Sequence, residues 1–431
     1  MLLYSRWFLA VNALEHVDGK CDRCSHSEDS CDKHGALKTL WSVKRVAHEG
    51  ESADEKTERN DEGNDVHCAI LPAAVTEQRG DTIRIMSLSI AIAPDSFKGT
   101  LTARRAADAM ARGWRSVRPA DEITVLPQAD GGEGTLDAFE AAVSGCVRHL
   151  AVGVTGPDGR PTEAAWLELP DGTAVVELAE SSGLPLMREP DALGATTRGL
   201  GEVIAAALDA GAHSLLIALG GSASTDAGLG ALEALGLRVE GNCDRSTLRP
   251  PPPGGVTLLT DVTAPLLGPH GAAAAFGPQK GASADDVHEL EARLARVAAV
   301  LGGEPAHPGA GAAGGTAYGF AAAWGASIAS GADYLAALTG LDRVLASADV
   351  VITGEGRFDE QSMTGKVVGR VLGAAPHRSV VIAGSLAHPP PDVGYSLTEL
   401  AGSATAALAL PELWIEHAAA KAARDLPQRN R

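Results

Sequence analysis

The sequence predicts an α/β fold, and two observations lead to that prediction. From Met86 onward, short apolar runs typical of buried strands alternate with alanine-rich segments that have helical periodicity. Glycine and polar residues gather directly after these apolar runs, at the position where open α/β sheets bind their ligands. The length of 431 residues is enough for two or three domains.

The individual elements follow from these patterns. Apolar runs predict strands at residues 88–94, 122–127, 213–220, 348–354 and 378–384. Helices are expected from Thr100 or Thr102 to about Ser116, at 133–143, from 227 and from 365. Either threonine can cap the first helix, because its hydroxyl can accept a hydrogen bond from a backbone N–H of the first turn. The proline-rich segment 249–255 is expected to be a rigid loop.

The composition argues against two classes of partner. The formal net charge is −19, whereas nucleic acid or an anionic membrane surface requires an excess of lysine and arginine. No apolar run reaches the roughly 20 residues of a membrane span. Four of the six cysteines precede residue 86, so we expect no disulfide framework and a cytoplasmic location. A small anionic substrate is still compatible with this charge, because a few local bases and a helix N-terminus can bind it.

Residues 1–85 differ from the rest of the chain, and we expect an extension that is disordered or that results from a start site assigned too early. Residues 46–66 are highly charged and nearly free of large apolar side chains, which is typical of a disordered linker. Met86 stands directly before the first predicted strand, as expected of the true start. The alternative is a zinc knuckle, whose ligands would be Cys21, Cys24, Cys31 and His34.

Residues 93–100 form the first of five segments that combine glycine with hydroxyl, acidic or basic residues. Asp95, Ser96 and Lys98 follow a predicted strand and precede a predicted helix. Backbone N–H groups at such a helix start can hold a phosphate, and Lys98 can neutralise it. A capped helix start with a solvated lysine explains the pattern equally well.

Residues 128–135 carry two carboxylates, Asp130 and Glu133, on either side of a glycine pair. Acidic groups in such a turn can hold Mg²⁺ or accept the proton of a hydroxyl group. The simpler interpretation places Glu133 at a helix N-terminus, where the helix dipole stabilises it. On this segment alone, the simpler interpretation is favoured.

Residues 219–228 form a glycine–serine loop between a predicted strand and a helix that starts near Asp226. Glycines and hydroxyls in such a loop suit the binding of an anion. The residues concerned are Gly220, Gly221, Ser222 and Ser224. The loop is not a Walker A loop, because the spacing G-x-x-x-x-G-K-[ST] occurs nowhere in the chain.

Two more segments complete the set. The fourth segment covers residues 260–268 and 276–282, where Asp261 ends a predicted strand and Lys280 lies in a Gly-Pro loop. The last segment, 353–367, comes directly after a predicted buried strand. Its charged residues include Glu355, Arg357, Asp359 and Lys366.

These segments together resemble the bacterial glycerate kinase family, which phosphorylates glycerate without a P-loop. The resemblance runs from about residue 88 to at least residue 386. Its segments are, in chain order, IAPDSFKGTL, ADGGEGT, TGPDG, TTRGLGEVI, GGSASTDAG, DVTAPLLG, FGPQKGA, PGAGAAGG, TGEGRFDEQSMTGK and IAGS. Two features depart from the family: residues 241–259 look shorter and richer in proline, and 85 residues precede the first strand.

The resemblance implies two α/β domains. One is Rossmann-like and discontinuous, over residues 86–129 and 340–431, and the other is inserted between its parts, over residues 130–339. The resemblance also implies ATP as phosphate donor, Mg²⁺ as cofactor and D-glycerate as acceptor. It favours 2-phosphoglycerate over 3-phosphoglycerate as the product.

Each candidate residue then receives an expected role in phosphoryl transfer, which depends on positioning, a metal ion and positive charge. The carboxylates expected to hold Mg²⁺ are Asp95, Asp130 and Asp261. The expected catalytic residues are Asp95, Lys98, Asp226, Asp359 and Lys366. Lys98 and Lys366 would contact phosphate, and either Asp226 or Asp359 would accept the proton of the attacking hydroxyl. The expected substrate- or phosphate-binding residues are Ser96, Arg198, Gly220, Gly221, Ser222, Ser224, Lys280, Glu355 and Arg357.

Two other functions stay open at this point. The glycine–serine loop loosely resembles that of the galactokinase and homoserine kinase superfamily, so the acceptor could be another small hydroxy acid or alcohol. Outside enzymes, the alternative is a non-catalytic nucleotide-binding regulatory protein with a zinc-knuckle extension. The acidic and basic residues concentrated in the glycine loops favour an enzyme.

Overall fold

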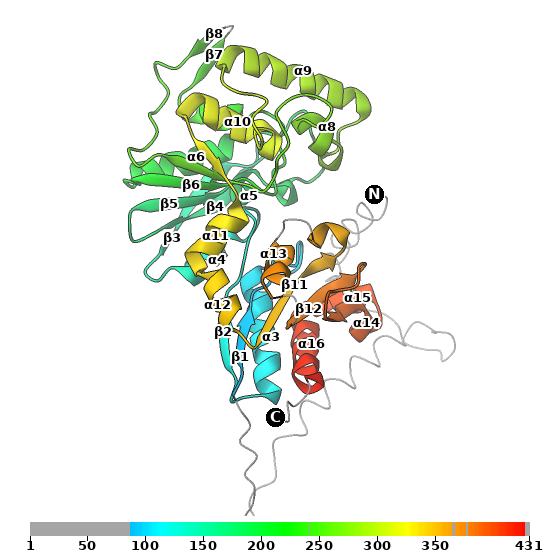
Figure 1. The fold of residues 1–431 in the computed structure, drawn as a ribbon. Helices are drawn as coiled ribbons and strands as arrows, with labels where there is room; N and C mark the ends of the chain where they lie inside the picture. The colour runs from blue at the N-terminus through cyan, green and yellow to red at the C-terminus, as the bar shows by residue number, and fades with distance from the viewer. Residues whose placement is uncertain (1–86, 241, 364–366, 376–377, 427–431) are drawn as a thin grey trace, which may run out of the picture. The chain divides into compact units, whose positions relative to one another are not determined.

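The computed structural model describes residues 87–240, 242–363, 367–375 and 378–426 (Figure 1). They belong to one compact unit of the chain. The predictions for the N-terminal extension, including the start at Met86 and the zinc ligands, fall outside the described residues, as does Lys366. The described chain contains parallel and mixed sheets with helices between their strands, which confirms the predicted α/β fold.

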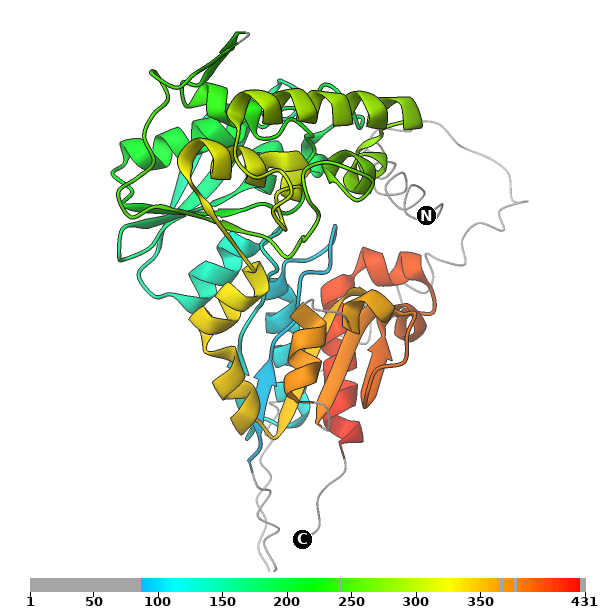
Figure 2. The same ribbon diagram turned by 45° about the horizontal axis from the view of Figure 1, so that its top comes forward.

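The first sheet has five parallel strands in the order β13-β12-β11-β1-β2. The strand bounds are β1 Ser89–Ile92, β2 Glu122–Val125, β11 Val350–Phe358, β12 Ser379–Leu386 and β13 Val393–Ser396. Figures 1 and 2 show β1, in blue, beside the gold and orange strands from the other end of the chain, with Ile90 opposite Val350 in the register. The strand order reverses between β1 and β11, and ligands of open α/β sheets bind at such a switch point.

The second sheet has six strands in the order β10-β9-β6-β5-β4-β3. Their bounds are β3 Val147–Thr155, β4 Pro161–Glu168, β5 Thr173–Glu177, β6 Ser214–Ala218, β9 Val256–Leu259 and β10 Ser327–Ala329. Strands β5, β6, β9 and β10 are parallel, whereas β3 and β4 run antiparallel to their neighbours. A separate two-stranded hairpin, β7 Arg238–Glu240 with β8 Asn242–Asp244, overlaps the segment that departs from the family.

The helices are mostly short and alanine-rich. Their bounds are α3 Ala103–Val117, α4 Thr135–Ala142, α5 Leu178–Ser182, α6 Arg198–Asp209, α7 Leu229–Ala234, α8 Ala272–Phe276, α9 Ala284–Leu301, α10 Ala312–Trp324, α11 Gly331–Thr339, α12 Leu341–Ser347, α13 Val367–Ala374, α14 Leu397–Ala401, α15 Ala404–Ala409 and α16 Pro411–Asp425. Short 3₁₀ turns cover η1 Leu184–Leu186, η2 Pro278–Lys280 and η3 Glu360–Met363. Thr102 caps α3, because its hydroxyl accepts a hydrogen bond from the Arg105 N–H at 3.3 Å. None of the described helices is long and apolar enough to cross a membrane.

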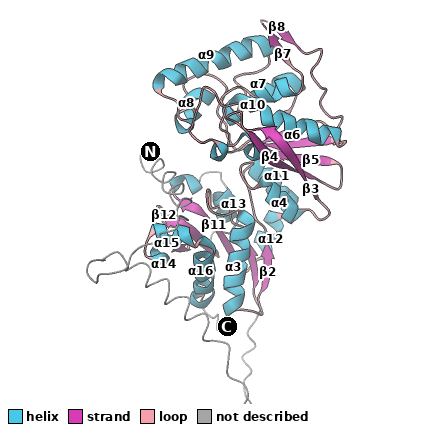
Figure 3. Ribbon diagram, turned by 180° about the vertical axis from the view of Figure 1, so that it is seen from behind, coloured by secondary structure: helices cyan, strands magenta, loops and turns pink. Residues whose placement is uncertain are grey.

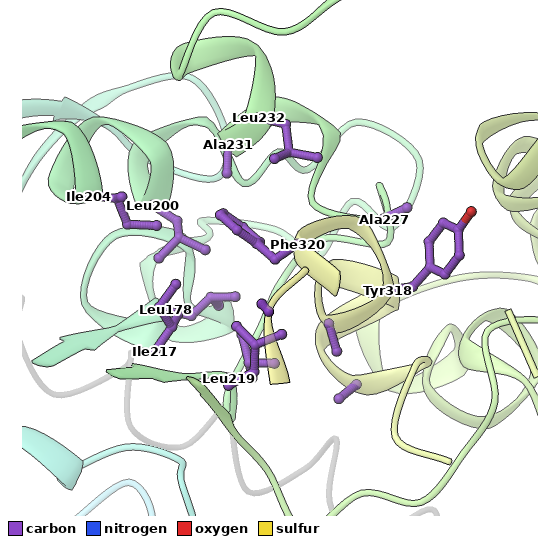
Figure 4. Close-up of a cluster of buried hydrophobic side chains, with 14 of the residues drawn as sticks. Leu178, Leu200, Ile204, Ile217, Leu219, Ala227, Ala231, Leu232, Tyr318 and Phe320 are labelled. Atoms are coloured by element: carbon purple, nitrogen blue, oxygen red, sulfur yellow. The ribbon is translucent and has the colours of Figure 1, made fainter. Parts of the chain in front are cut away.

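Small and medium aliphatic side chains fill the core of the second sheet. Leu178, Leu200, Ile217 and Phe320 pack together there with almost no exposed surface (Figure 4). Each buried aliphatic side chain contributes roughly 1.5–3 kcal/mol by leaving water. With few aromatic residues in the chain, this core depends on many such contacts.

The strands β3, β4, β5, β10 and β13 were not among the predicted ones, and neither was the hairpin of β7 and β8. β3 lies at the edge of its sheet and exposes Val147, Leu150 and Val152, so it lacks the continuous apolar run of a buried parallel strand. The predicted strand at 348–354 was too short, because β11 continues pairing with β12 as far as Phe358.

Helices α3 and α16 pack side by side against the first sheet (Figure 3). The approach is close because Gly113 of α3 has no side chain. A Cβ atom at this position would lie 2.1 Å from the Glu416 carbonyl oxygen. The backbones therefore fit only with glycine at position 113.

Gly113→Ala is expected to destabilise the protein by about 1–3 kcal/mol, because the new methyl group overpacks the α3–α16 contact. Gly373→Ala is the matched control. Gly373 is an exposed helical glycine with no atom within 4 Å of an added Cβ, so this change is expected to stabilise by up to about 1 kcal/mol. Denaturant midpoints of both variants check the prediction, and equal midpoints would contradict the packing argument.

Candidate active site

The segment after β1 and the strand β11 lie side by side at the switch point of the first sheet. The Asp95 N–H donates to the Gly354 carbonyl at 2.9 Å, and the Thr353 hydroxyl donates to the Ala93 carbonyl at 2.8 Å. Asp95 thus lies next to the part of β11 that carries Glu355. Two of the five segments singled out in the sequence meet here.

Asp95 is buried among other charges. Burial is the main cause that raises its pKa to about 7, and the negative charge of Asp130 raises it further. Lys98 acts in the opposite direction, and the Ser96 N–H donates to the Asp95 carboxylate at 2.6 Å. Glu355 adds a smaller repulsion. The site therefore gathers carboxylates that a cation would stabilise.

A loop of glycines joins this group to the second sheet. The Gly220 N–H donates to the Gly131 carbonyl at 2.8 Å. A Cβ at Gly131 would lie 2.6 Å from the Leu259 carbonyl oxygen, and one at Gly220 would lie 2.3 Å from the Gly132 Cα. Gly131 also has a φ of 86°, which favours glycine. The loop is thus locked against the carboxyl ends of β6 and β9.

Asp261 follows β9 and lies beside the same loop. Its carboxylate accepts a hydrogen bond from the Ser330 hydroxyl at 2.7 Å. Burial raises the pKa of Asp261, and the charge of Asp130 contributes to that rise. A Cβ at Gly331 would lie 2.5 Å from the Asp130 carbonyl oxygen, so α11 also starts against this loop.

These carboxylates are candidate ligands for Mg²⁺. Within the described residues, no three acidic, histidine or cysteine side chains are already arranged to hold an ion. Mg²⁺ usually binds one or two carboxylates and completes its shell with water and phosphate oxygens. Asp95 and Asp130, which repel each other, fit that kind of site because a cation between them would remove the repulsion.

A pocket opens next to this group at the N-terminus of α3. Its lining comes from the loop after β1, the first turn of α3 and the start of α4. The lining residues are Ser96, Lys98, Gly99, Thr100, Leu101, Thr102, Arg105, Glu133 and Gly134. Lys98 and the backbone N–H groups at this helix N-terminus make the pocket suited to an anion, whereas Arg105 is paired with Glu412 at 2.6 Å. Glu133 also reaches the glycine–serine loop, since a Cβ at Gly221 would lie 3.5 Å from its Cγ.

Asp226 holds the glycine–serine loop in place. One carboxylate oxygen accepts hydrogen bonds from the Thr197 N–H at 2.9 Å, the Thr197 hydroxyl at 2.7 Å and the Gly230 N–H at 3.2 Å. The other accepts from the Gly228 N–H at 3.1 Å. A carboxylate with four donors ties α6 to α7 and has little capacity left for a substrate proton.

The backbone directly after Asp226 is strained. Ala227 has a φ of 54°, in the left-handed region that residues other than glycine seldom adopt. Its N–H donates to the Gly314 carbonyl at 3.0 Å, and a Cβ at Gly319 would lie 2.0 Å from its carbonyl oxygen. Such conformations persist only where the surroundings fix them, and they concentrate at functional sites.

Lys280 lies beneath the same loop, not on its surface. Its side chain is 1% exposed, and its ammonium donates to the Ser222 hydroxyl at 2.9 Å and to the Ser224 carbonyl. Burial lowers the pKa of Lys280 to about 7, and the charge of Asp226 partly opposes that shift. Lys280 therefore contacts the loop itself, and the partly exposed Ser222 stands between it and solvent.

The sequence model of the glycerate kinase family matches residues 90–250 and 244–427 of this chain. The chain belongs to the glycerate kinase family. It is 40% identical over 332 residues to the Glycerate 2-kinase of Escherichia coli (strain K12). The aligned region covers 69% of this chain and 86% of that protein. The Glycerate kinase of Bacillus subtilis (strain 168) is 40% identical over 328 residues, with shares of 69% and 84%.

The fold leads to the same family. A crystallised protein from Salmonella typhimurium LT2, described as a glycerate kinase 2, matches with a TM-score of 0.64 and 33% identity. The match covers 79% of this chain and 98% of that protein. As a member of the glycerate kinase family, the chain is a kinase.

The two arginines expected to bind substrate lie on separate elements of this kinase, α6 and β11. Arg198 starts α6, where its guanidinium pairs with Glu202 at 3.1 Å and is half exposed. Arg357 lies on β11 and pairs with Asp359 at 3.4 Å. Asp359 also accepts a hydrogen bond from the Gln361 N–H at 3.0 Å. Arg357 thus belongs to the strand beside Asp95 and Asp359 follows that strand directly, whereas Arg198 faces the surface of α6.

Glu177 is a residue that the sequence reasoning missed in this kinase. It is 4% exposed at the end of β5 and accepts hydrogen bonds from the Gly134 N–H at 3.0 Å and the Leu136 N–H at 3.2 Å. Burial raises its pKa to about 8, although the two N–H groups act against that rise. The available signal was an acidic residue ending the otherwise apolar run TAVV. Glu177 fixes the loop that carries Glu133.

Asp226→Asn is expected to lower the free energy of unfolding by about 3 kcal/mol. Both carboxylate oxygens of Asp226 accept hydrogen bonds, whereas an amide has one acceptor oxygen and its NH₂ group would face N–H groups that also donate. The control is Asp209→Asn, where the side chain is 72% exposed and pairs with Arg249; a change below about 1 kcal/mol is expected there. Denaturation midpoints measure both. A stable Asp226→Asn protein with lost activity would instead support Asp226 as the base.

Proposed function

We propose that the protein transfers the γ-phosphoryl group of ATP to D-glycerate and forms 2-phosphoglycerate. The observation that carries the proposal is the convergence of three parts: the basic pocket at α3, the carboxylates around Asp95, and the glycine–serine loop. Glu133 and the loop at Gly131 join these parts through the contacts described above. The E. coli relative is named as a glycerate 2-kinase, which supports both the acceptor and the product.

The domain boundaries are part of this proposal. We place a Rossmann-like domain at 86–129 and 340–431, and an inserted domain at 130–339. The strands of the five-stranded sheet lie inside the first two ranges, and those of the six-stranded sheet lie inside the third. The site then forms where the chain passes from the first domain to the second, at Asp130.

The pocket at α3 is the proposed place for the phosphates. Lys98 and the N–H groups at the helix start would hold the phosphoryl group that moves, with Ser96 beside them. Asp95 and Asp130 would hold Mg²⁺, with Asp261 as a further candidate. When bound, Mg²⁺ would neutralise the phosphate charges that Lys98 alone cannot balance.

The glycine–serine loop is the proposed place for the glycerate carboxylate. The Ser222 hydroxyl and the backbone of Gly220 and Gly221 are suited to an anion, and Arg357 is the candidate guanidinium partner. Asp359 is favoured over Asp226 as acceptor of the hydroxyl proton, because Asp226 already accepts four hydrogen bonds. A weak base is sufficient, since phosphoryl transfer depends mainly on positioning and charge.

Lys98→Ala is expected to reduce kcat/KM about 100-fold or more, because it removes positive charge at the moving phosphoryl group. Asp130→Ala is expected to have an effect of similar size through loss of a metal ligand. Lys421→Ala is the control, since Lys421 is an exposed lysine of α16 paired with Asp425. A coupled assay for ADP release measures all three. Near-wild-type activity in both Lys98→Ala and Asp130→Ala would falsify this assignment of the site.

With ATP, Mg²⁺ and a panel of acceptors, D-glycerate is expected to give the highest kcat/KM. ³¹P NMR of the reaction mixture should then contain 2-phosphoglycerate as the product. A higher kcat/KM for another hydroxy acid or alcohol would favour the alternative acceptor. ATP binding without turnover of any acceptor, with zinc retained on the full chain, would favour the regulatory protein.

A further inference from the structure

A buried cation lies behind the proposed carboxylate-binding loop. Lys280 comes from the turn η2, far in sequence from the loop, and its ammonium reaches the Ser222 hydroxyl and the Ser224 carbonyl. With 1% of its side chain exposed, Lys280 has no surface with which to contact a substrate. Any effect on a ligand must therefore pass through the loop.

The hydrogen bond to Ser222 determines what that hydroxyl can do. A serine hydroxyl has one hydrogen to donate and two lone pairs to accept with. An ammonium has only donors, so Ser222 must accept from Lys280, and its own hydrogen is left to be donated elsewhere. Ser222 is partly exposed, so that hydrogen is available to a ligand at the surface of the loop. A charged donor on the oxygen also strengthens the hydroxyl as a donor.

The backbone around Ser222 is held independently of Lys280. The Leu184 N–H donates to the Gly221 carbonyl at 2.9 Å, and the Ala223 N–H donates to the Ser182 carbonyl at 2.9 Å. These bonds pair the loop with the segment 182–184 on both sides of Ser222. Loss of the ammonium is therefore expected to let the Ser222 hydroxyl rotate, while the backbone of the loop keeps its hydrogen bonds to residues 182–184.

Among the described residues, Asp226 is the acidic group whose charge acts on Lys280. Asp226 acts on the ammonium, and its own position is fixed by the N–H groups of Thr197, Gly228 and Gly230. Pro190, in the segment before α6, packs against Gly281. A Cβ atom added at Gly281 would lie 2.9 Å from the Pro190 Cβ. The Lys280 ammonium is thus stabilised by the charge of Asp226 and donates a hydrogen bond to the Ser222 hydroxyl.

We propose that Lys280 is a positioning residue, which orients the Ser222 hydroxyl to donate to the carboxylate of the acceptor substrate without touching that substrate. The inference rests on the proposed function, because it assigns the carboxylate of D-glycerate to the glycine–serine loop. It differs from a purely structural role, which would affect both substrates equally.

The first test is a double-mutant cycle with Lys280→Met, Ser222→Ala and the combined variant, and with Lys421→Met as the matched control. Each single change is expected to raise the KM for D-glycerate about tenfold and to leave the KM for ATP within twofold. The combined variant should be no worse than the more affected single variant, because both changes remove the same hydrogen bond. Multiplying effects, or equal increases in both KM values, overturn the positioning role.

The second test needs no change at Lys280 and remains valid if Lys280→Met fails to fold. Since burial lowers the pKa of Lys280 to about 7, its positive charge is lost as the pH rises through that value. The KM for D-glycerate in the wild type should therefore rise between about pH 6.5 and 9, measured at saturating ATP. In Ser222→Ala this rise should be absent. A rise of the same size in Ser222→Ala contradicts the inference.

The two levels of the proposal fail in different ways. D-glycerate turnover by the wild type, combined with an unchanged KM in Ser222→Ala, overturns the role of Lys280 and leaves the proposed function standing. Absence of D-glycerate turnover in the wild type overturns both.

Discussion

Contact between backbones at Gly131, Gly132 and Gly220 is the constraint on which the rest of the site depends. Cβ atoms at the first and last of these positions would lie well under 3 Å from neighbouring backbone atoms. Because the glycines fit so closely, Asp130 on one side and Glu133 on the other have fixed places. The repulsion between Asp130 and Asp95 follows from this fit, since the energy of two charges depends on their separation.

Behind that contact lies a set of charges that face the interior of the protein. Glu177 and Asp226 accept backbone hydrogen bonds, and Lys280 donates to a hydroxyl and a carbonyl. Burying such groups without partners would cost several kcal/mol each, so their partners are as important as the charges themselves. The inward-facing groups therefore fix the conformation of the loops, and the more exposed groups on those loops are available to bind a ligand.

The sequence predicted the fold class and most strands of the parallel sheets, because buried parallel strands have continuous apolar runs. It did not predict β3, whose exposed edge position removes that signal, and it also missed β4, β5, β10 and β13. The glycine-rich segments were recognisable as candidate sites, but their convergence was not, since it depends on contacts such as Gly131 with Leu259. Lys280 and Asp226 were expected to face a ligand, and only their hydrogen bonds reveal that they hold the loop. Glu177 was missed because one acidic residue at the end of a strand is a weak signal.

The pairing of β1 with β11 has a consequence for how the chain folds as it is made. The Thr353 hydroxyl meets a carbonyl 260 residues earlier in the sequence. At the usual rate of 5–20 residues per second, the ribosome needs roughly 13–50 s to supply the partner of β1. During that interval β1 and β2 lack the centre of their sheet, whereas all six strands of the second sheet are synthesised before β11 begins. The order of synthesis therefore favours completion of the second sheet before the switch point, and with it the site, can form.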